Sequence, residues 1–318
     1  MFEYIVSNIL DYINSLFNID NKIAIPKKIG TYTVVRSLSL ESMSDTAVLL
    51  CKDKNNKKVV VKVWQGKYKN TSHFGLLNEY NAYKILWSTI KKIGKNMPSI
   101  FKDIKLPRLI DYIENKGQTV LVIEWIDGGN NLEKYSDTKI VKTYKKVLKY
   151  FDYISSKISV RDKQKLNIIN PIHYVLTYPF YILIASVLNF SFIKIIISGA
   201  TIFMRGLNNI IEDNKLIFVH RDLNFKNIIV KGGVNYIIDF QYAVFTIKVV
   251  EYVNTLRYSW DKDIIKDSLI EIAKLANNKM QLKSLIVAHG THGLTARNFN
   301  KKTISNIVAY IRKGIELN

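Results

Sequence analysis

Residues 218–240 of the chain read FVHRDLNFKNIIVKGGVNYIIDF, and this stretch decides the interpretation of the whole sequence. An acid, Asp222, precedes an amide, Asn227, and a second acid, Asp239, comes at the end of a returning strand. The pair Gly232–Gly233 predicts a tight hairpin turn, which would let Asn227 and Asp239 converge. Two oxygen donors of this kind suit Mg²⁺, and Asp222 is left as a base or orienting group for a hydroxyl. These are the parts that phosphoryl transfer requires.

Two charged residues upstream supply an independent signal. Lys62 interrupts the apolar strand VVVKVW, and a buried lysine needs a counter-charge. Glu79 falls within the apolar stripe of a helix predicted around Leu76–Ile90, so its carboxylate faces the protein interior. We therefore predict that the two side chains pair.

At these residues the chain resembles the protein-kinase-like superfamily. HRDLNFKN is similar to the catalytic-loop pattern H-R-D-L-x-x-x-N, and YIIDF is similar to the metal-binding strand end. The resemblance implies that ATP and Mg²⁺ are cofactors, with Asp222 as the catalytic base and Asn227 and Asp239 as the magnesium ligands. It also implies that Glu79 orients Lys62 onto the α- and β-phosphates.

The same resemblance extends to two further nucleotide contacts. The stretch VLVIEWIDGG looks like the hinge between lobes, where backbone groups from Glu124 to Ile126 would bind the adenine. The loop SLSLESMSDT stands where a glycine-rich loop is expected, and it has no glycine. Hydroxyl and backbone donors of Ser39, Ser42 and Ser44 are expected to replace it.

Lys226 lies between the expected base and Asn227. One interpretation is catalytic: its ammonium touches the transferred phosphoryl group and neutralises charge in the transition state. The other is that the side chain points to water.

The spacing of the motifs separates the branches of the superfamily. A long insertion lies between Glu124 and Asp222, Gln241 replaces the glycine of D-F-G, and no A-P-E follows. The chain thus resembles the aminoglycoside phosphotransferase and choline kinase branch, which implies a small-molecule or saccharide acceptor. Two alternatives stay open: a Ser/Thr protein kinase, favoured by Arg221, and a non-catalytic pseudokinase scaffold, favoured by the glycine-free loop.

The predicted fold class is α+β, in the bilobal protein-kinase-like arrangement. We expect a small antiparallel sheet with one main helix, followed by a larger, mainly helical lobe. Strands are predicted at 30–38, 46–52, 59–64, 107–115 and 119–126. The expected parts are an N-terminal amphipathic helix (1–28), an N-lobe (29–126) and a C-lobe (127–318) with a helical insert (130–215), the catalytic hairpin (218–240) and C-terminal helices.

Composition limits the partners. The chain has 47 Lys and Arg against 26 Asp and Glu, a net charge of +21, which attracts anions. Arginine, the usual reader of phosphates and bases, is scarce, so nucleic-acid binding is not expected. A single cysteine, Cys51, fits a reducing compartment, and we expect a cytoplasmic protein.

Residues 174–204 form an unusually apolar segment. The first expectation is a pair of helices buried in the large lobe. The rival is an apolar surface lying on a bilayer, which would make the protein peripheral at the anionic inner face of a membrane and its acceptor a lipid-linked or membrane-associated saccharide.

Overall fold

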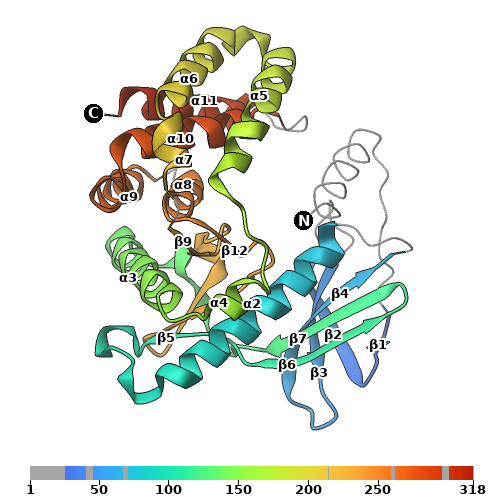
Figure 1. Ribbon diagram of the computed structural model, residues 1–318. Coiled ribbons are helices and arrows are strands. Elements are labelled where there is room, and N and C mark those ends of the chain that lie inside the picture. Colours follow the sequence, from blue (N-terminus) through green and yellow to red (C-terminus); the bar gives the residue numbers. More distant parts are fainter. Residues whose placement is uncertain are drawn as a thin grey trace. The chain divides into compact units, whose positions relative to one another are not determined.

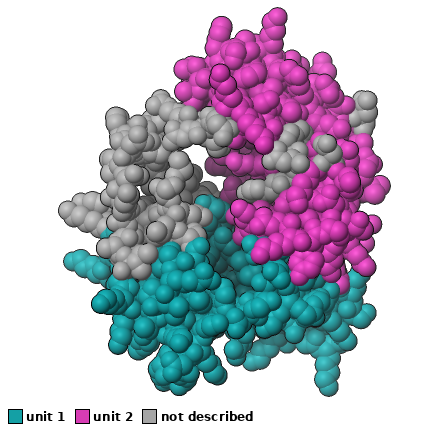
Figure 2. All heavy atoms as spheres, turned by 180° about the vertical axis from the view of Figure 1, so that it is seen from behind, with its two compact units in different colours: residues 1–131, 158–167, 228–243 teal, residues 132–157, 168–227, 244–318 magenta. Residues whose placement is uncertain are grey.

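The computed structural model describes residues 26–40, 46–66, 71–213, 215–258, 262–295 and 301–317. Most of the helix predicted for residues 1–28, and Ser42 and Ser44 of the expected phosphate loop, lie outside this part of the chain. The chain forms two compact units, shown in Figure 2. Unit 1 comprises residues 1–131, 158–167 and 228–243, and unit 2 comprises residues 132–157, 168–227 and 244–318. The lobe limits given above, 29–126 and 127–318, stay predictions.

The main sheet of unit 1 is antiparallel and has the strand order β1-β2-β3-β4-β7-β6. Its strands are β1 (Lys28–Ile29), β2 (Tyr32–Leu40), β3 (Thr46–Lys52), β4 (Lys58–Gln65), β6 (Leu109–Asn115) and β7 (Gln118–Glu124). One face forms an apolar core to which β4 contributes Val59, Val61 and Val63. Because successive side chains of a strand alternate between faces, Lys62 points to the opposite face.

Helix α2 (Thr71–Ile93) packs against β4, β6 and β7 (Figure 1). Its buried face carries Leu76, Tyr83 and Leu86 at helical spacing, and Glu79 lies on the same face with no exposed area. The helix therefore brings a carboxylate to the sheet.

A second sheet in unit 1 has the order β5-β11-β10-β8. Its strands are β5 (Ile104–Lys105), β8 (Asn130–Asn131), β10 (Ile228–Lys231) and β11 (Val234–Ile237). Strands β10 and β11 form the predicted hairpin, and the turn residues Gly232 and Gly233 have φ of 55° and 78°. Both angles lie in the left-handed region, which a two-residue turn of this kind demands and which glycine adopts at low cost. Unit 1 also contains η1 (Gly94–Asn96), η2 (Ser99–Phe101) and α4 (Val160–Lys163).

Unit 2 is mainly helical. Its helices are η3 (Leu132–Lys134), α3 (Asp137–Ser155), α5 (Pro171–Leu188), η4 (Phe190–Phe192), α6 (Ile193–Arg205), α7 (Leu207–Ile211), η5 (Phe225–Asn227), α8 (Val249–Tyr258), α9 (Asp263–Ala276), α10 (Lys279–Gly293) and α11 (Lys301–Glu316). Strands β9 (Leu216–Val219) and β12 (Val244–Ile247) pair antiparallel. Helix α10 is buried along most of its length and packs against α5, α6, α8 and α11.

The α+β fold class is confirmed, and the five longer strands of the main sheet lie where the sequence predicts them. Helix α2 begins at Thr71, earlier than predicted. The expectation of a buried helix pair over 174–204 is wrong in its burial. Helices α5 and α6 are present, but only a narrow stripe of each is buried.

Candidate active site

The Lys62 ammonium lies between two carboxylates of unit 1. Its Nζ is 2.8 Å from Oε2 of Glu79 and 2.6 Å from Oδ1 of Asp239. The side chains of Lys62 and Glu79 are 8% and 0% exposed, whereas that of Asp239 is 24% exposed. The predicted pair of Lys62 and Glu79 is therefore present, with Asp239 as a third member at its accessible side.

Helix α2 holds the segment that carries Asp239. The side-chain amide of Asn78 donates to the carbonyl oxygens of Gln241, at 3.1 Å, and Ala243, at 2.6 Å. The ring of Tyr83 packs edge-on against Phe240, with ring centroids 5.1 Å apart. Because both contacts come from α2, the helix that supplies Glu79 also fixes the position of Asp239.

The charges of this cluster do not balance, since two carboxylates share one ammonium. Burial disfavours the Lys62 ammonium, but the carboxylates of Asp239 and Glu79 outweigh that effect and raise the pKa of Lys62. Burial raises the pKa of Glu79 to about 7, against the opposing charge of Lys62 and with added repulsion from Asp239. The excess negative charge at the accessible carboxylate suits a bound cation.

The residues of the predicted catalytic loop form a hydrogen-bond network within unit 2. The amide nitrogen of Asn227 donates to the backbone oxygen of Asp222, at 2.8 Å, and to its Oδ2, at 3.0 Å. Asn224 donates to Oδ1 of Asp222, at 3.3 Å, and its own Oδ1 accepts from the backbone N–H groups of Lys226 and Asn227. The side-chain amides of Asn224 and Asn227 therefore hold the Asp222 carboxylate in one orientation, and this carboxylate is partly exposed.

A buried glutamate anchors the start of this loop. Oε2 of Glu251, in α8, accepts hydrogen bonds from the backbone N–H groups of His220 and of Arg221, the latter at 3.3 Å. Burial raises the pKa of Glu251 to about 7, and the two backbone donors act in the opposite direction. The loop is held from its other side by Tyr144 of α3, whose hydroxyl donates to the carbonyl of Leu223 at 2.6 Å.

Both parts of the 218–240 stretch contain an uncommon backbone conformation. Among the described residues, positive φ outside glycine occurs at Asn56, Arg221 and Asp239, with values of 60°, 64° and 69°. Side-chain-bearing residues adopt this region at a cost, and such strain concentrates at functional sites. Arg221 directly precedes Asp222, and Asp239 itself carries the second carboxylate of the motif, so in both places the uncommon backbone conformation determines where a carboxylate lies.

The expected hinge residues begin at Glu124, the last residue of β7. The backbone N–H of Glu124 donates to the carbonyl of Arg108 at 2.9 Å, and its carboxylate accepts from the backbone N–H of Arg108 at 3.1 Å. The side chain of Ile126 is buried, and its carbonyl accepts from the N–H of Gly129 at 3.4 Å. The backbone N–H of Glu124 is therefore not available to bind an adenine, because it already donates to Arg108.

The remaining predicted site residue is Lys226. Its side chain is exposed, and its backbone N–H is bound to Asn224 as described. Sequence reasoning missed three positioning residues: Asn78, Tyr144 and Glu251. Each acts on backbone atoms, which leave no side-chain signature at the other end of the contact.

A magnesium site would use few protein ligands. Within the described ranges, no group of three or more histidine, cysteine, aspartate or glutamate side chains is arranged to hold a metal ion. The available oxygen donors of the motif are the Asp239 carboxylate and the amide oxygen of Asn227, whose nitrogen is engaged by Asp222. Each of these is an oxygen ligand of the kind that Mg²⁺ accepts, and the ion needs few from the protein because it retains waters and takes other ligands from substrate phosphates.

No protein-family model and no curated protein sequence matches the chain. Solved structures match over nearly its whole length. The aminoglycoside phosphotransferase APH(4)-Ia, in a ternary complex with AMP-PNP and hygromycin B, has a TM-score of 0.63 at 14% identity, covering 91% of this chain and 96% of the other. The choline kinase LicA from Streptococcus pneumoniae has a TM-score of 0.56 at 15% identity and covers 99% of both chains.

The chain has the aminoglycoside phosphotransferase fold. The amicoumacin kinase hAmiN, solved with AMP-PNP and Ca²⁺, agrees with this, with a TM-score of 0.54 at 9% identity over 96% of this chain and 92% of the other. The fold predicted from the 218–240 motif, the protein-kinase-like arrangement of the aminoglycoside phosphotransferase and choline kinase branch, is thereby confirmed. These neighbours are small-molecule kinases.

Proposed function

We propose that the protein is a kinase that moves the γ-phosphoryl group of ATP to a hydroxyl of a small molecule or sugar. The observation that carries this proposal is the buried Lys62 ammonium, paired with both Glu79 and Asp239 in a chain with the fold of small-molecule kinases. A structural role alone does not explain this cluster. Its two carboxylates and one ammonium leave an excess negative charge, and Asp239 brings that charge to the solvent-exposed side.

In this proposal unit 1 binds the nucleotide. Lys62 contacts the α- and β-phosphates, and Glu79 holds the lysine in position. Because the N–H of Glu124 is taken, the adenine would meet the carbonyl of Glu124 and the N–H of Ile126. Ser42 is proposed to donate a hydrogen bond to a phosphate of the nucleotide. Two of these neighbours, APH(4)-Ia and hAmiN, were solved with AMP-PNP or ADP, which supports nucleotide binding.

Asn227 and Asp239 are proposed to hold Mg²⁺ together with the phosphates. When bound, the ion neutralises charge on the β- and γ-phosphates. The chain itself links the two ligands: Asn227 directly precedes Ile228, the first residue of β10, and Ile228 pairs with Ile237 near the end of β11. Asp239 follows Ile237 by two residues.

Asp222 is proposed to orient the acceptor hydroxyl. The hydroxyl oxygen attacks the γ-phosphorus, the bond from that phosphorus to the β–γ bridging oxygen breaks, ADP leaves, and the hydroxyl proton passes to Asp222. The two amides that hold this carboxylate fix its direction for the task. Lys226 is proposed to neutralise charge on the transferred group, which its exposed side chain allows.

The acceptor class follows from the fold only in outline. APH(4)-Ia was solved with hygromycin B, and the other neighbours are a choline kinase and an amicoumacin kinase, so the fold serves varied small acceptors. A lipid-linked or membrane-associated saccharide, met by a cytoplasmic protein at the inner face of a membrane, is the finer proposal.

The test uses two substitutions and one control. Asp222→Asn is expected to keep the thermal shift produced by Mg-ATP and to lose turnover by at least about a thousandfold. Asp239→Asn is expected to lose the metal-dependent part of that shift, and Glu212→Gln, an exposed acid of unit 2, to change neither. Turnover is measured as ATP consumed with sugars, amino alcohols and lipid head groups as acceptors.

Three outcomes would overturn the proposal. Equal turnover in Asp222→Asn would remove the assigned base. A metal-dependent shift retained in Asp239→Asn would remove the assigned ligand. A wild-type protein that neither binds nor consumes Mg-ATP would instead be the non-catalytic scaffold that the glycine-free loop SLSLESMSDT favours.

A further inference from the structure

One face of helix α5 exposes a continuous row of large apolar side chains. Ile172, Leu176, Phe180, Leu183 and Val187 are between 51% and 72% exposed. They recur at intervals of three and four residues, so they share one side of the helix. The only helix of the described chain long and apolar enough to cross a membrane is this one, Pro171–Leu188, and 17% of it is buried.

The opposite side of α5 packs on unit 2 through a much narrower stripe. Tyr178 and Ala185, seven residues apart, are buried, and α5 packs against α10. The hydroxyl of Tyr178 lies 3.4 Å from that of Thr291 in α10. The helix is therefore docked by a thin stripe while most of its apolar surface faces away from the protein.

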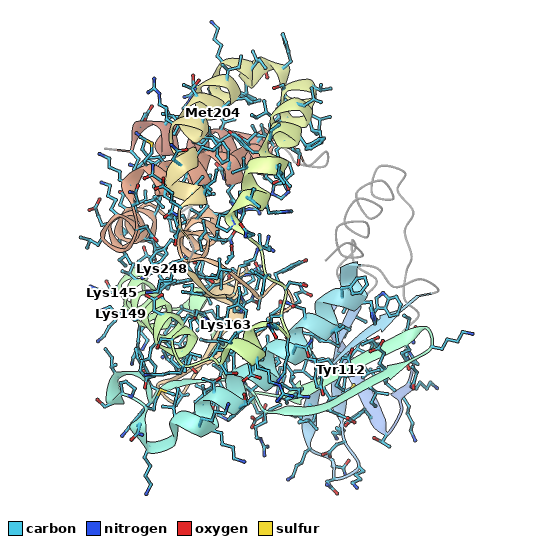
Figure 3. All side chains as sticks on the ribbon, in the orientation of Figure 1. Tyr112, Lys145, Lys149, Lys163, Met204 and Lys248 are labelled. Carbon is cyan, nitrogen blue, oxygen red and sulfur yellow. The ribbon has the colours of Figure 1, made fainter. Side chains whose placement is uncertain are left out.

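The next elements in the chain, η4 and α6, also expose large apolar side chains. Phe190 is 75% exposed, and Ile197 and Met204, also on one side of their helix, are 56% and 65% exposed; Met204 is labelled in Figure 3. The inward side of α6 is closely packed, since a Cβ on Gly199 would lie 2.6 Å from Val287. We call the eight exposed residues of α5, η4 and α6 the apolar face: Ile172, Leu176, Phe180, Leu183, Val187, Phe190, Ile197 and Met204.

The charges along the segment that carries the apolar face have one sign. Between Asp162 and Glu212 the sequence has no acidic residue, while Lys194 and Arg205, both exposed, lie at the two ends of α6. The whole chain carries +21. A partner protein surface or a second copy of this chain would bring no general excess of negative charge, whereas an anionic lipid surface offers both apolar depth and negative head groups.

We propose that the apolar face is a docking surface for an anionic lipid bilayer, on which α5 and α6 lie in the interfacial region. Lying is favoured over spanning because Tyr178 and Ala185 remain buried and α5 packs against α10, so α5 cannot enter the hydrocarbon alone without breaking that packing. The apolar side chains insert while Lys194 and Arg205 meet the head groups. This inference does not depend on phosphoryl transfer, since no residue of the catalytic network takes part.

The test compares two matched triple variants. In the first, Phe180, Leu183 and Val187 of the apolar face are replaced by serine. In the control, Val160, Ile264 and Leu275, which are 66% to 89% exposed elsewhere, are replaced by serine. All six side chains are exposed, so both variants are expected to fold, and unfolding curves check this.

Binding is measured by flotation and by titration with vesicles of phosphatidylcholine alone and of phosphatidylcholine with phosphatidylglycerol in equal parts. Wild type and control are expected to bind the anionic vesicles, to bind the neutral ones more weakly, and to lose affinity at high salt. The apolar-face variant is expected to bind the anionic vesicles at least about tenfold more weakly.

Three results would overturn the proposal. The first is absence of wild-type binding to anionic vesicles. The second is equal binding by the apolar-face variant, which would show that scattered lysines suffice. The third is that wild type sediments as a dimer and binds no vesicles, while the apolar-face variant sediments as a monomer. This result would show that a second copy of the chain covers the apolar face.

Discussion

The Lys62 cluster of unit 1 and the Asp222 loop of unit 2 are held in contrasting ways. Around Lys62, charged side chains hold one another, and the cluster is buried except at Asp239. Around Asp222, amides, a tyrosine and Glu251 hold backbone atoms, and the carboxylate itself stays partly exposed. The contacts around Lys62 position charged side chains, whereas the contacts around Asp222 position a loop of the backbone.

This difference determines how strongly a substitution in each region should affect stability. A buried charge cluster depends on every member, because removing one leaves another charge without compensation. A loop held by several separate hydrogen bonds loses them one at a time, each at a cost of about 1 kcal/mol. A single substitution around Lys62 should therefore reduce stability strongly, whereas each single substitution around Asp222 should reduce it only slightly.

The largest expected effect comes from Lys62→Met. The substitution leaves Glu79 buried beside Asp239 without a cation, and we expect a loss of about 3 to 5 kcal/mol in the free energy of unfolding, with loss of the Mg-ATP thermal shift. Urea unfolding measures the first effect and thermal melting the second.

The matched control is Lys58→Met. That lysine lies on the same strand and pairs with Asp127 at 3.3 Å, but the two side chains are 47% and 66% exposed. Solvent screens such a pair, so stability and nucleotide binding should both stay near wild type. A Lys62 variant no less stable than this control would contradict the view of the cluster as mutually dependent.

An intermediate effect is expected from Glu251→Gln, and it depends on pH. The pKa of Glu251 is raised by burial to about 7, so the folded state binds more protons than the unfolded state between its ordinary pKa and about 7. Stability from this group is full at low pH and is lost as pH rises through that window. Glutamine keeps an acceptor for His220 and Arg221 but does not titrate.

The variant should therefore gain stability relative to wild type as pH rises from 5 to 8, by on the order of 2 kcal/mol. Unfolding curves at several pH values measure the difference. A difference that stays constant over this range would show that the carboxyl titrates normally and would remove the burial argument.

The smallest expected effect separates Tyr144 from Tyr310. Each hydroxyl donates to a buried backbone carbonyl, that of Leu223 at 2.6 Å and that of Val253 at 2.9 Å. Both Tyr→Phe changes should cost about 1 kcal/mol of stability. Only Tyr144→Phe removes a contact to the proposed catalytic loop, so only this change should lower turnover, by severalfold. Equal turnover in the two variants would show that the loop does not need this anchor.

The sequence predicted the parts of the site whose signal lies in side chains. Lys62 within an apolar strand and Glu79 within an apolar helical stripe are each anomalous alone, and their contact explains both. The glycine pair at 232–233 gave the hairpin in the same way, because its backbone angles demand glycine. Long strands of β-branched residues were predictable for the same local reason.

The rest could not be read from local pattern. Glu251 and Asn78 bind backbone atoms far away in the chain, so neither partner marks the contact in the sequence. The apolar segment 174–204 misled in another way. Its composition predicts helices, but whether an apolar helix is covered depends on tertiary neighbours, which composition does not contain.

The chain passes repeatedly between its units, and this has a practical outcome for protein engineering. Unit 1 is assembled from three separate stretches, and the last of them, 228–243, begins directly after Asn227. No single cut can release either unit intact, and neither can be transplanted as one contiguous cassette into another chain of this fold. A chimaera would have to exchange the 228–243 hairpin together with the sheet on which it folds.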